Sequence, residues 1–235
     1  HSCILLRILI GMYRRFARLF ILCMFISWTA IAQERDFGTW YTFSLSHKLD
    51  VRWSVGMSEQ IRLNRNLSTV DLFFTEASVQ YVLAKNLKAS VNYRFIRKNE
   101  LDYWSIRHGF FADLSWRRKF KPIVIGARGR VQARTEDFFN PTLDMAPDLF
   151  FRTRIQVTYD PGGRTEPFAS VESFVMLHSA SDPFLNGNLT RMRYEAGIQH
   201  DFDKRNSVTL SYLVQFNRIV RLQEYILCIG YSYGF

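Results

Sequence analysis

The sequence predicts an all-β protein, a closed antiparallel up-and-down transmembrane β-barrel of about 10–12 strands. Three observations support this fold class: apolar and polar residues alternate with period two beyond residue 38, polar turns separate the alternating segments, and aromatic residues make up 16% of the chain. No helical period competes over a comparable length. Because no apolar run reaches the roughly 18 residues that a spanning helix needs, a bundle of membrane helices is excluded.

The segment before residue 33 has the layout of a cleaved export signal. Several arginines precede a short apolar stretch at residues 19–28, and small residues follow up to Ala32. A membrane anchor is the alternative, but the apolar stretch is too short for one. We therefore predict that residues 1–32 are removed, with Gln33 as the new N-terminus, and that the protein is exported to the outer membrane of a Gram-negative bacterium.

The charge balance limits the class of partner. Without the leader, 27 basic residues remain against 21 acidic ones, because the leader contains four arginines and no acidic residue. Such a moderate basic excess suits outer-membrane lipid and small anionic solutes. The only short basic tract is Arg117-Arg118-Lys119, so no nucleic acid is predicted as a partner.

Ten alternating segments form the predicted barrel at residues 50–235. They cover residues 50–63, 67–83, 86–98, 103–117, 121–135, 148–160, 166–178, 191–202, 208–217 and 224–235. The preceding part, residues 33–49, alternates between Thr39 and His47 and forms either a short strand or a lead-in. As a strand it would make the number odd, whereas bacterial single-chain barrels normally have an even number.

The connections between the segments differ at the two predicted rims. Those at one rim are short polar turns, and those at the other are longer or more irregular, the longest being 136–147 and 179–190. This arrangement is typical of outer-membrane barrels, which have short periplasmic turns and long extracellular loops. The two longest loops are where a surface receptor or adhesin would bind its partner.

Alternation alone does not decide which face contacts lipid, because a soluble barrel would turn the same apolar residues inward. Aromatic rings near the ends of the apolar face favour a membrane, since such rings prefer the lipid–water boundary. One predicted girdle contains Trp53, Tyr81, Trp116, Tyr159, Phe202 and Tyr233, and the other contains Phe74, Phe95, Tyr103 and Phe216. The apolar face is therefore predicted to face lipid and the arginine-bearing face to line the lumen.

The last segment also carries a predicted assembly signal. Tyr231, Tyr233 and Phe235 alternate on one face up to the final residue of the sequence. An alternating aromatic end of this kind resembles the signal that the outer-membrane assembly machinery reads. We therefore predict that machinery as a partner. The sequence does not indicate an oligomeric state.

Several short motifs resemble those of a known family. They are Phe37-Gly38-Thr39-Trp40, Glu59-Gln60-Ile61-Arg62, Tyr81, Tyr93-Arg94 and Arg193-Tyr194-Glu195-Ala196-Gly197, followed by the terminal strands. Over nearly the whole mature length the chain resembles the outer-membrane β-barrels grouped as domain of unknown function 2490. The resemblance implies a barrel and an outer-membrane location. It implies no activity, so no site residue is carried over from it.

The predicted lumen face is rich in charge. Its basic residues are Arg52, Arg62, Arg94, Arg107, Arg128, Arg130, Arg152, Arg154, Arg191 and Arg193, and its acidic residues are Glu76, Asp113, Glu172, Glu195 and Glu224. A ring of guanidinium groups could select anions in a narrow pore. Alternatively, the arginines and carboxylates could pair and fill a structural barrel, because buried charges are tolerated when paired. Both alternatives stay open at this point.

The sequence contains few residues in patterns typical of a catalytic or metal-binding site. Cys3 and Cys23 lie in the leader, which leaves Cys228 without a partner for a disulfide, and no histidine has metal-ligand spacing. His178 beside Ser179 is the one pair that suggests hydrolysis of a lipid. We predict a non-enzymatic protein without cofactor or metal, acting as a structural barrel or a small, anion-preferring pore. An outer-membrane lipid hydrolase and a surface receptor or adhesin are the alternatives.

Overall fold

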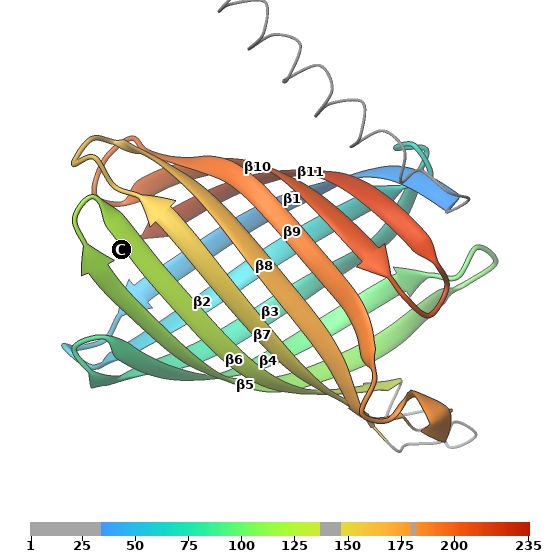
Figure 1. The fold of residues 1–235 in the computed structure, drawn as a ribbon. Helices are drawn as coiled ribbons and strands as arrows, with labels where there is room; N and C mark the ends of the chain where they lie inside the picture. The colour runs from blue at the N-terminus through green and yellow to red at the C-terminus, as the bar shows by residue number, and fades with distance from the viewer. Residues whose placement is uncertain (1–33, 137–146, 180–181) are drawn as a thin grey trace, which may run out of the picture. The chain divides into compact units, whose positions relative to one another are not determined.

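The computed structural model describes residues 34–136, 147–179 and 182–235, and these form a closed β-barrel of eleven tilted strands (Figure 1). The predicted cleavage site at Ala32 and Gln33 lies outside the described residues. The strands are β1 (Glu34–Lys48), β2 (Trp53–Asn64), β3 (Thr69–Ala84), β4 (Leu87–Asn99), β5 (Trp104–Phe120), β6 (Ile123–Glu136), β7 (Asp148–Tyr159), β8 (Thr165–His178), β9 (Leu189–Asp201), β10 (Asn206–Asn217) and β11 (Leu222–Gly234). A short 3-10 helix, η2 (Pro183–Leu185), lies between β8 and β9.

The ten segments predicted from residue 50 onward correspond to β2 to β11. The alternating stretch before them belongs to β1, which is 15 residues long. It pairs with β2 from Thr39 opposite Leu63 to Lys48 opposite Ser54. This stretch is therefore a full strand of the wall, which resolves the alternative between a short strand and a lead-in.

The seam between β1 and β11 differs from the other pairings. Consecutive strands are antiparallel all along the chain, so in a closed barrel of eleven strands the first and the last run in the same direction. Accordingly, both strands end at the same rim, where the Phe235 N–H donates to the Ser46 carbonyl at 2.9 Å and His47 Nδ1 hydrogen-bonds to the Phe235 carbonyl at 2.7 Å. The sheet is thus mixed rather than wholly antiparallel, because the additional strand makes the number odd.

The predicted assembly signal lies beside this seam. The rings of Tyr231 and Phe43 stack across it with centroids 5.8 Å apart. The ring of Tyr233 near the end of β11 lies beside that of Phe235, directly after the strand, with centroids 6.0 Å apart. These aromatic residues therefore form an outer strip where the two ends of the barrel wall meet.

Short turns follow β1, β3, β5, β7 and β9 at the rim where β11 ends. In the first of them, Asp50 Oδ1 accepts the backbone N–H groups of Arg52 and Trp53 at 2.6 Å each. The bonds from Trp53 and Arg52 lower the pKa of the Asp50 carboxyl. Arg52 was predicted to line the lumen, but it lies in this exposed turn and donates to the Tyr81 hydroxyl at 3.1 Å. That prediction was wrong because Arg52 precedes β2, so the alternation of side chains between the two faces of that strand does not determine its orientation.

Side chains alternate between the two faces of the wall. In β2, Met57 and Ile61 are each 48% exposed on the outside, whereas Ser58, Gln60 and Arg62 line the interior cavity. The same alternation around the barrel gives an outer surface rich in large apolar side chains, among them Phe110, Leu114, Val131, Phe151, Ile155, Val171, Ile198 and Leu210. This is the orientation that the sequence predicts for a wall surrounded by lipid.

Among the described residues, the protein has no helix with the length and apolar character to span a bilayer.

One predicted girdle residue faces the other way. Phe74 lies inside the barrel and is 5% exposed. Residues two apart in a strand share a face, so Phe74 lies on the same side as the lumen-lining Glu76. Its neighbour Phe73 takes the outer position and contacts the ring of Trp104 with centroids 6.4 Å apart. The prediction for Phe74 was therefore wrong because, of two adjacent phenylalanines, only one can face outward.

A carboxylate occupies the middle of the outer face. Glu59 lies halfway along β2, between the outward-facing Met57 and Ile61, and accepts hydrogen bonds of 2.7 and 2.9 Å from the hydroxyl of Thr75. A charged group facing hydrocarbon at this depth is unfavourable. We expect Glu59→Leu to raise the free energy of unfolding in lipid vesicles by about 1 kcal/mol, measured by urea titration of tryptophan fluorescence.

The matched control for Glu59 is the next residue along the strand, which faces inward. Gln60→Leu removes hydrogen bonds to Arg62 and Thr42 and should lower the free energy of unfolding. Destabilisation by Glu59→Leu would contradict the outward, lipid-facing position of Glu59.

Candidate functional site

The barrel encloses a cavity of about 770 Å³. Besides Arg52, Arg62 and Glu224, the predicted lumen face has twelve charged residues. Eleven of the twelve line this cavity: Glu76, Arg94, Arg107, Arg128, Arg130, Arg152, Arg154, Glu172, Arg191, Arg193 and Glu195. The twelfth, Asp113, lies against Arg130 and is 8% exposed at its side chain. Arg62 and Glu224 also line the cavity. The inward face is therefore the charged face, as strand alternation requires.

A second cavity of about 240 Å³ lies near the rim of short turns, between β5, β6 and β7. Arg128 and Arg154 belong to the lining of both cavities. Arg128 donates to Glu172 at 2.6 Å and Arg154 donates to Glu195 at 3.0 Å. The two cavities therefore meet at these two ion-paired side chains.

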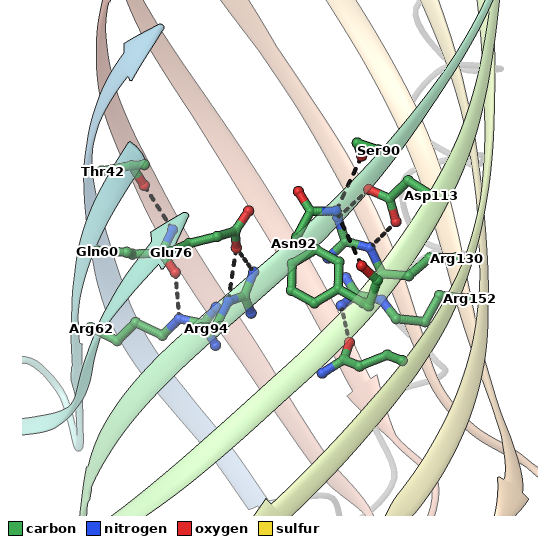
Figure 2. Close-up of polar contacts among 12 residues, drawn as sticks. Thr42, Gln60, Arg62, Glu76, Ser90, Asn92, Arg94, Asp113, Arg130 and Arg152 are labelled. Carbon is green, nitrogen blue, oxygen red and sulfur yellow. Dashed lines mark hydrogen bonds and ion pairs between the residues drawn. The ribbon is translucent and has the colours of Figure 1, made fainter. Parts of the chain in front are cut away.

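The most regular ion pair joins Arg130 and Asp113, which are opposite each other on β6 and β5. Arg130 Nε and Nη2 donate to the two carboxylate oxygens at 2.6 and 2.7 Å (Figure 2). Both side chains are less than 9% exposed. A bidentate, buried pair of this kind is rigid and holds the Arg130 guanidinium group in one orientation.

Glu172 on β8 is the central carboxylate of the lumen. It accepts from Arg152 at 2.9 and 3.0 Å and from Arg128 at 2.6 Å, and Arg193 Nη1 lies 3.5 Å from its other oxygen. Its side chain is 7% exposed. One negative charge therefore holds three guanidinium groups from β6, β7 and β9 in place.

Other ion pairs extend the network along the wall. Arg94 and Glu76 pair through the Nε donor at 2.9 Å and also through Nη2 (Figure 2). Arg107 pairs with Glu100 at 2.6 Å, and Arg134 Nη2 lies 2.9 Å from Asp148 Oδ2. Most lumen arginines thus have a carboxylate within direct contact.

Inward-facing aromatic rings alternate with the arginines around the lumen. The guanidinium carbon of Arg62 is 3.8 Å from the centre of the Trp40 ring, and Arg94, Arg130 and Arg152 lie at 4.0, 3.8 and 4.2 Å from the rings of Phe74, Phe111 and Phe174, respectively. Arg193 lies at 4.7 Å from Phe174 and 5.0 Å from Trp40, which brings the series back to β1. We call these residues the arginine–aromatic belt. Stacking on a ring holds each guanidinium plane in one orientation, so less side-chain entropy is lost when the group forms hydrogen bonds.

The sequence reasoning missed this belt. Two of its rings come from pairs of adjacent phenylalanines, in which one ring faces outward and the other inward. Phe110 is 47% exposed outside while Phe111 is 3% exposed inside, and Phe73 and Phe74 divide in the same way. Such a doublet in an alternating strand is the signal that could have revealed the belt.

Two lumen arginines have no carboxylate partner. In the described part of the chain, neither Arg62 nor Arg191 forms an ion pair, although both line the larger cavity. Arg62 Nε donates to Gln60 at 2.6 Å, and Gln60 in turn donates to the Thr42 hydroxyl at 2.7 Å (Figure 2). The lumen is therefore electrostatically uneven, because most of its arginines are in direct contact with carboxylates, whereas Arg62 and Arg191 lie beyond ion-pair distance of the described ones.

The residues considered for hydrolysis have structural contacts. His178 is exposed at the end of β8. Ser179 donates its backbone N–H to Asn186 Oδ1 at 2.8 Å, and its hydroxyl oxygen accepts the backbone N–H of Asp182 at 3.2 Å. These bonds connect Ser179 to residues on either side of η2. Within the ranges that the structure describes, no group of three or more His, Cys, Asp or Glu side chains could hold a metal ion.

Comparison with known proteins supports the fold. The model of a family described as "Protein of unknown function (DUF2490)" matches residues 37–221. The NanC porin structure aligns with a TM-score of 0.54 at 15% identity, over 84% of this chain and 98% of that one. LpxR from Salmonella typhimurium aligns with a TM-score of 0.53 at 10% identity, over 82% of this chain and 87% of that one. No curated protein matches the sequence.

Proposed function

The chain belongs to the DUF2490 family of proteins of unknown function, and from the geometry of its lumen we propose that it is a narrow, anion-preferring pore of the outer membrane. The observation that carries this proposal is the charge of the larger cavity, which is lined by eleven basic and six acidic side chains. A basic excess in a confined, low-dielectric passage concentrates anions and repels cations. Of two similar folds, one is the NanC porin, a porin by its own description, and the other is LpxR from Salmonella typhimurium.

The proposed route passes through both cavities. The larger cavity reaches residues at the long-loop rim, such as Asn217 and Ile219, and the smaller one reaches the short-turn rim at Trp116 and Arg117. The two cavities meet at Arg128 and Arg154, so these side chains form the proposed constriction. A solute would pass when the side chains of Arg128 and Arg154 move aside into the two adjoining cavities.

The second candidate function is a structural barrel with a blocked interior. The observation that favours it is the extent of ion pairing, in which Glu172 alone engages three arginines. Paired charges cost less to bury and bridge a narrow lumen well. In that case outer-membrane lipid and the assembly machinery, which we propose reads Tyr231, Tyr233 and Phe235, would be the only partners. Catalysis has weaker support, because Ser179 is engaged in its loop.

Conductance of the purified protein in a planar bilayer tests the pore. We expect stable steps with anion selectivity. Removing Arg128 and Arg154 together, both by substitution with alanine, should raise the single-channel conductance about twofold or more and weaken the selectivity, because the proposed constriction and two of its charges disappear. Ion flow and reversal potential in a salt gradient are the two measurements.

The matched control is Arg97→Ala. Arg97 lies on the outer face of β4, where its guanidinium carbon is 5.7 Å from the ring of Phe73, so the lumen is unchanged. Wild-type conductance and selectivity are expected for this variant. A bilayer that stays silent with folded protein, and also with the double alanine variant, would contradict the pore and favour the structural barrel.

A further inference from the structure

We propose that Arg62 is the anion-binding residue of the lumen and that it binds a small organic solute through a carboxylate or phosphate group. This inference deepens the proposed function. Transport of the solute depends on the proposed pore, whereas binding of the solute at Arg62 does not. It assigns different roles to the lumen arginines. Those paired with carboxylates build the wall. Of the two arginines without an ion pair in the described residues, Arg62 is the one whose Nε is fixed by a hydrogen bond, to Gln60, so it is the one to which solute binding is assigned.

The side chain of Arg62 is held in one orientation by three neighbours. Its guanidinium group stacks on Trp40 at 3.8 Å, its Nε donates to Gln60 at 2.6 Å, and Gln60 is fixed by its bond to Thr42 at 2.7 Å. All four residues come from β1 and β2 and line the cavity. With Nε engaged, the two Nη groups remain to donate in parallel, which is the geometry that binds both oxygens of a carboxylate or two oxygens of a phosphate.

The surroundings of Arg62 add positive charge. Arg193 contacts the same Trp40 ring at 5.0 Å, and Arg94 contacts the Phe74 ring that Arg62 also approaches at 5.5 Å. Neighbouring cations raise the local potential and make a bound anion more favourable. The contrast is Arg130, whose Nε and Nη2 both donate to Asp113, at 2.6 and 2.7 Å.

The acidic groups nearby lie beyond ion-pair distance of Arg62 in the described part of the chain, although Asp71 attracts its charge from further away. Asp71 lies on β3 at the bulge opposite Arg62 and Leu63, and lines the same cavity without forming an ion pair with Arg62. Glu224 on β11 accepts from the Gln215 amide, and Gln215 also accepts from Arg193 at 2.7 Å. These bonds direct the carboxylate of Glu224 toward the β9–β10 side. Arg62 therefore keeps its Nη donors available to a solute.

The size of the cavity indicates the class of solute. A volume of about 770 Å³ lies within the range of sites for small organic molecules and exceeds what one inorganic ion fills. Most of its lining is polar, and the inward rings are covered by guanidinium groups. The fitting solute is therefore a small polar molecule that carries a carboxylate or a phosphate.

Fluorescence of Trp40 gives a direct test in detergent-solubilised, folded protein. Iodide is an anionic quencher and acrylamide a neutral one, and the signal of Trp40 is isolated by subtracting that of a Trp40→Phe variant. We expect Arg62→Gln to lower the ratio of iodide to acrylamide quenching constants about threefold or more, because the charge that concentrates iodide at Trp40 is removed. Acetate and inorganic phosphate, added separately to the wild type, distinguish the two groups by which of them displaces iodide.

Arg134→Gln is the matched control. Arg134 lines the same cavity but is paired with Asp148 at 2.9 Å. Its variant should keep the wild-type ratio of quenching constants. An equal fall in both variants, or no fall in Arg62→Gln, would overturn the assignment to Arg62. Displacement of iodide in a protein that does not conduct would support the anion site at Arg62 and overturn the pore. Conduction, with a ratio of quenching constants that Arg62→Gln leaves unchanged, would support the pore and overturn the anion site.

Discussion

Replacing Glu172 by glutamine is expected to lower the free energy of unfolding by about 3–5 kcal/mol, the largest effect that we predict for a single charge in this barrel. The carboxylate is 7% exposed and binds Arg152, Arg128 and Arg193. Without it, three guanidinium groups from neighbouring strands repel one another in a lumen of low dielectric constant. Urea unfolding in lipid vesicles, followed by tryptophan fluorescence and by the heat-dependent shift of gel mobility, measures the loss.

Glu166→Gln is the matched control on the same strand. Glu166 lies near the rim, where its only ion pair within the described ranges is a 3.9 Å contact with the 68% exposed Arg117. Its loss should change stability by less than about 0.5 kcal/mol. Combining Glu172→Gln with Arg152→Gln should recover part of the loss, because the pair is then removed as a unit. If Glu172→Gln were as stable as Glu166→Gln, the central role of Glu172 would be wrong.

Replacing Gly197 by alanine is expected to lower the free energy of unfolding by about 2–3 kcal/mol. Gly197 on β9 is opposite Ser211 on β10. A Cβ at this position would lie 2.4 Å from Ser211 Cβ, 2.5 Å from the Leu210 carbonyl oxygen and 2.7 Å from Ser211 Cα. Two of these three contacts are to backbone, so β9 and β10 would have to separate locally and weaken their ladder.

Gly230→Ala is the control for this steric effect. Gly230 on β11 is opposite Thr209, and a Cβ there would lie 3.7 Å from Thr209 Cβ, an ordinary contact. The control should stay within about 0.5 kcal/mol of the wild type in the same urea titration. Equal losses in the two variants would show that a general property of glycine, rather than the close approach at Gly197, determines the effect.

Much of the barrel could be predicted because its wall repeats a simple local rule. Period-two alternation places Arg152, Arg154 and Gln156 on one face of β7, whatever strands lie beside it. The positions of the turns follow similarly from short polar stretches such as Asp203 to Asn206. The predicted orientation was wrong for Arg52, which lies in a turn where the alternation does not apply. It was also wrong for Phe74, because alternation alone does not say which of the adjacent Phe73 and Phe74 faces outward.

The amino-acid sequence alone defines the strands, their turns and the face on which nearly every arginine lies, because these properties depend on neighbours within a few residues. Tertiary structure decides the parallel seam at β1 and β11 and the partners of the charges. Arg128 and Glu172 meet although 44 positions separate them, while Arg62 meets a tryptophan and a glutamine instead of a carboxylate. Such pairings depend on strand register and on distances across the closed lumen, which no local pattern encodes.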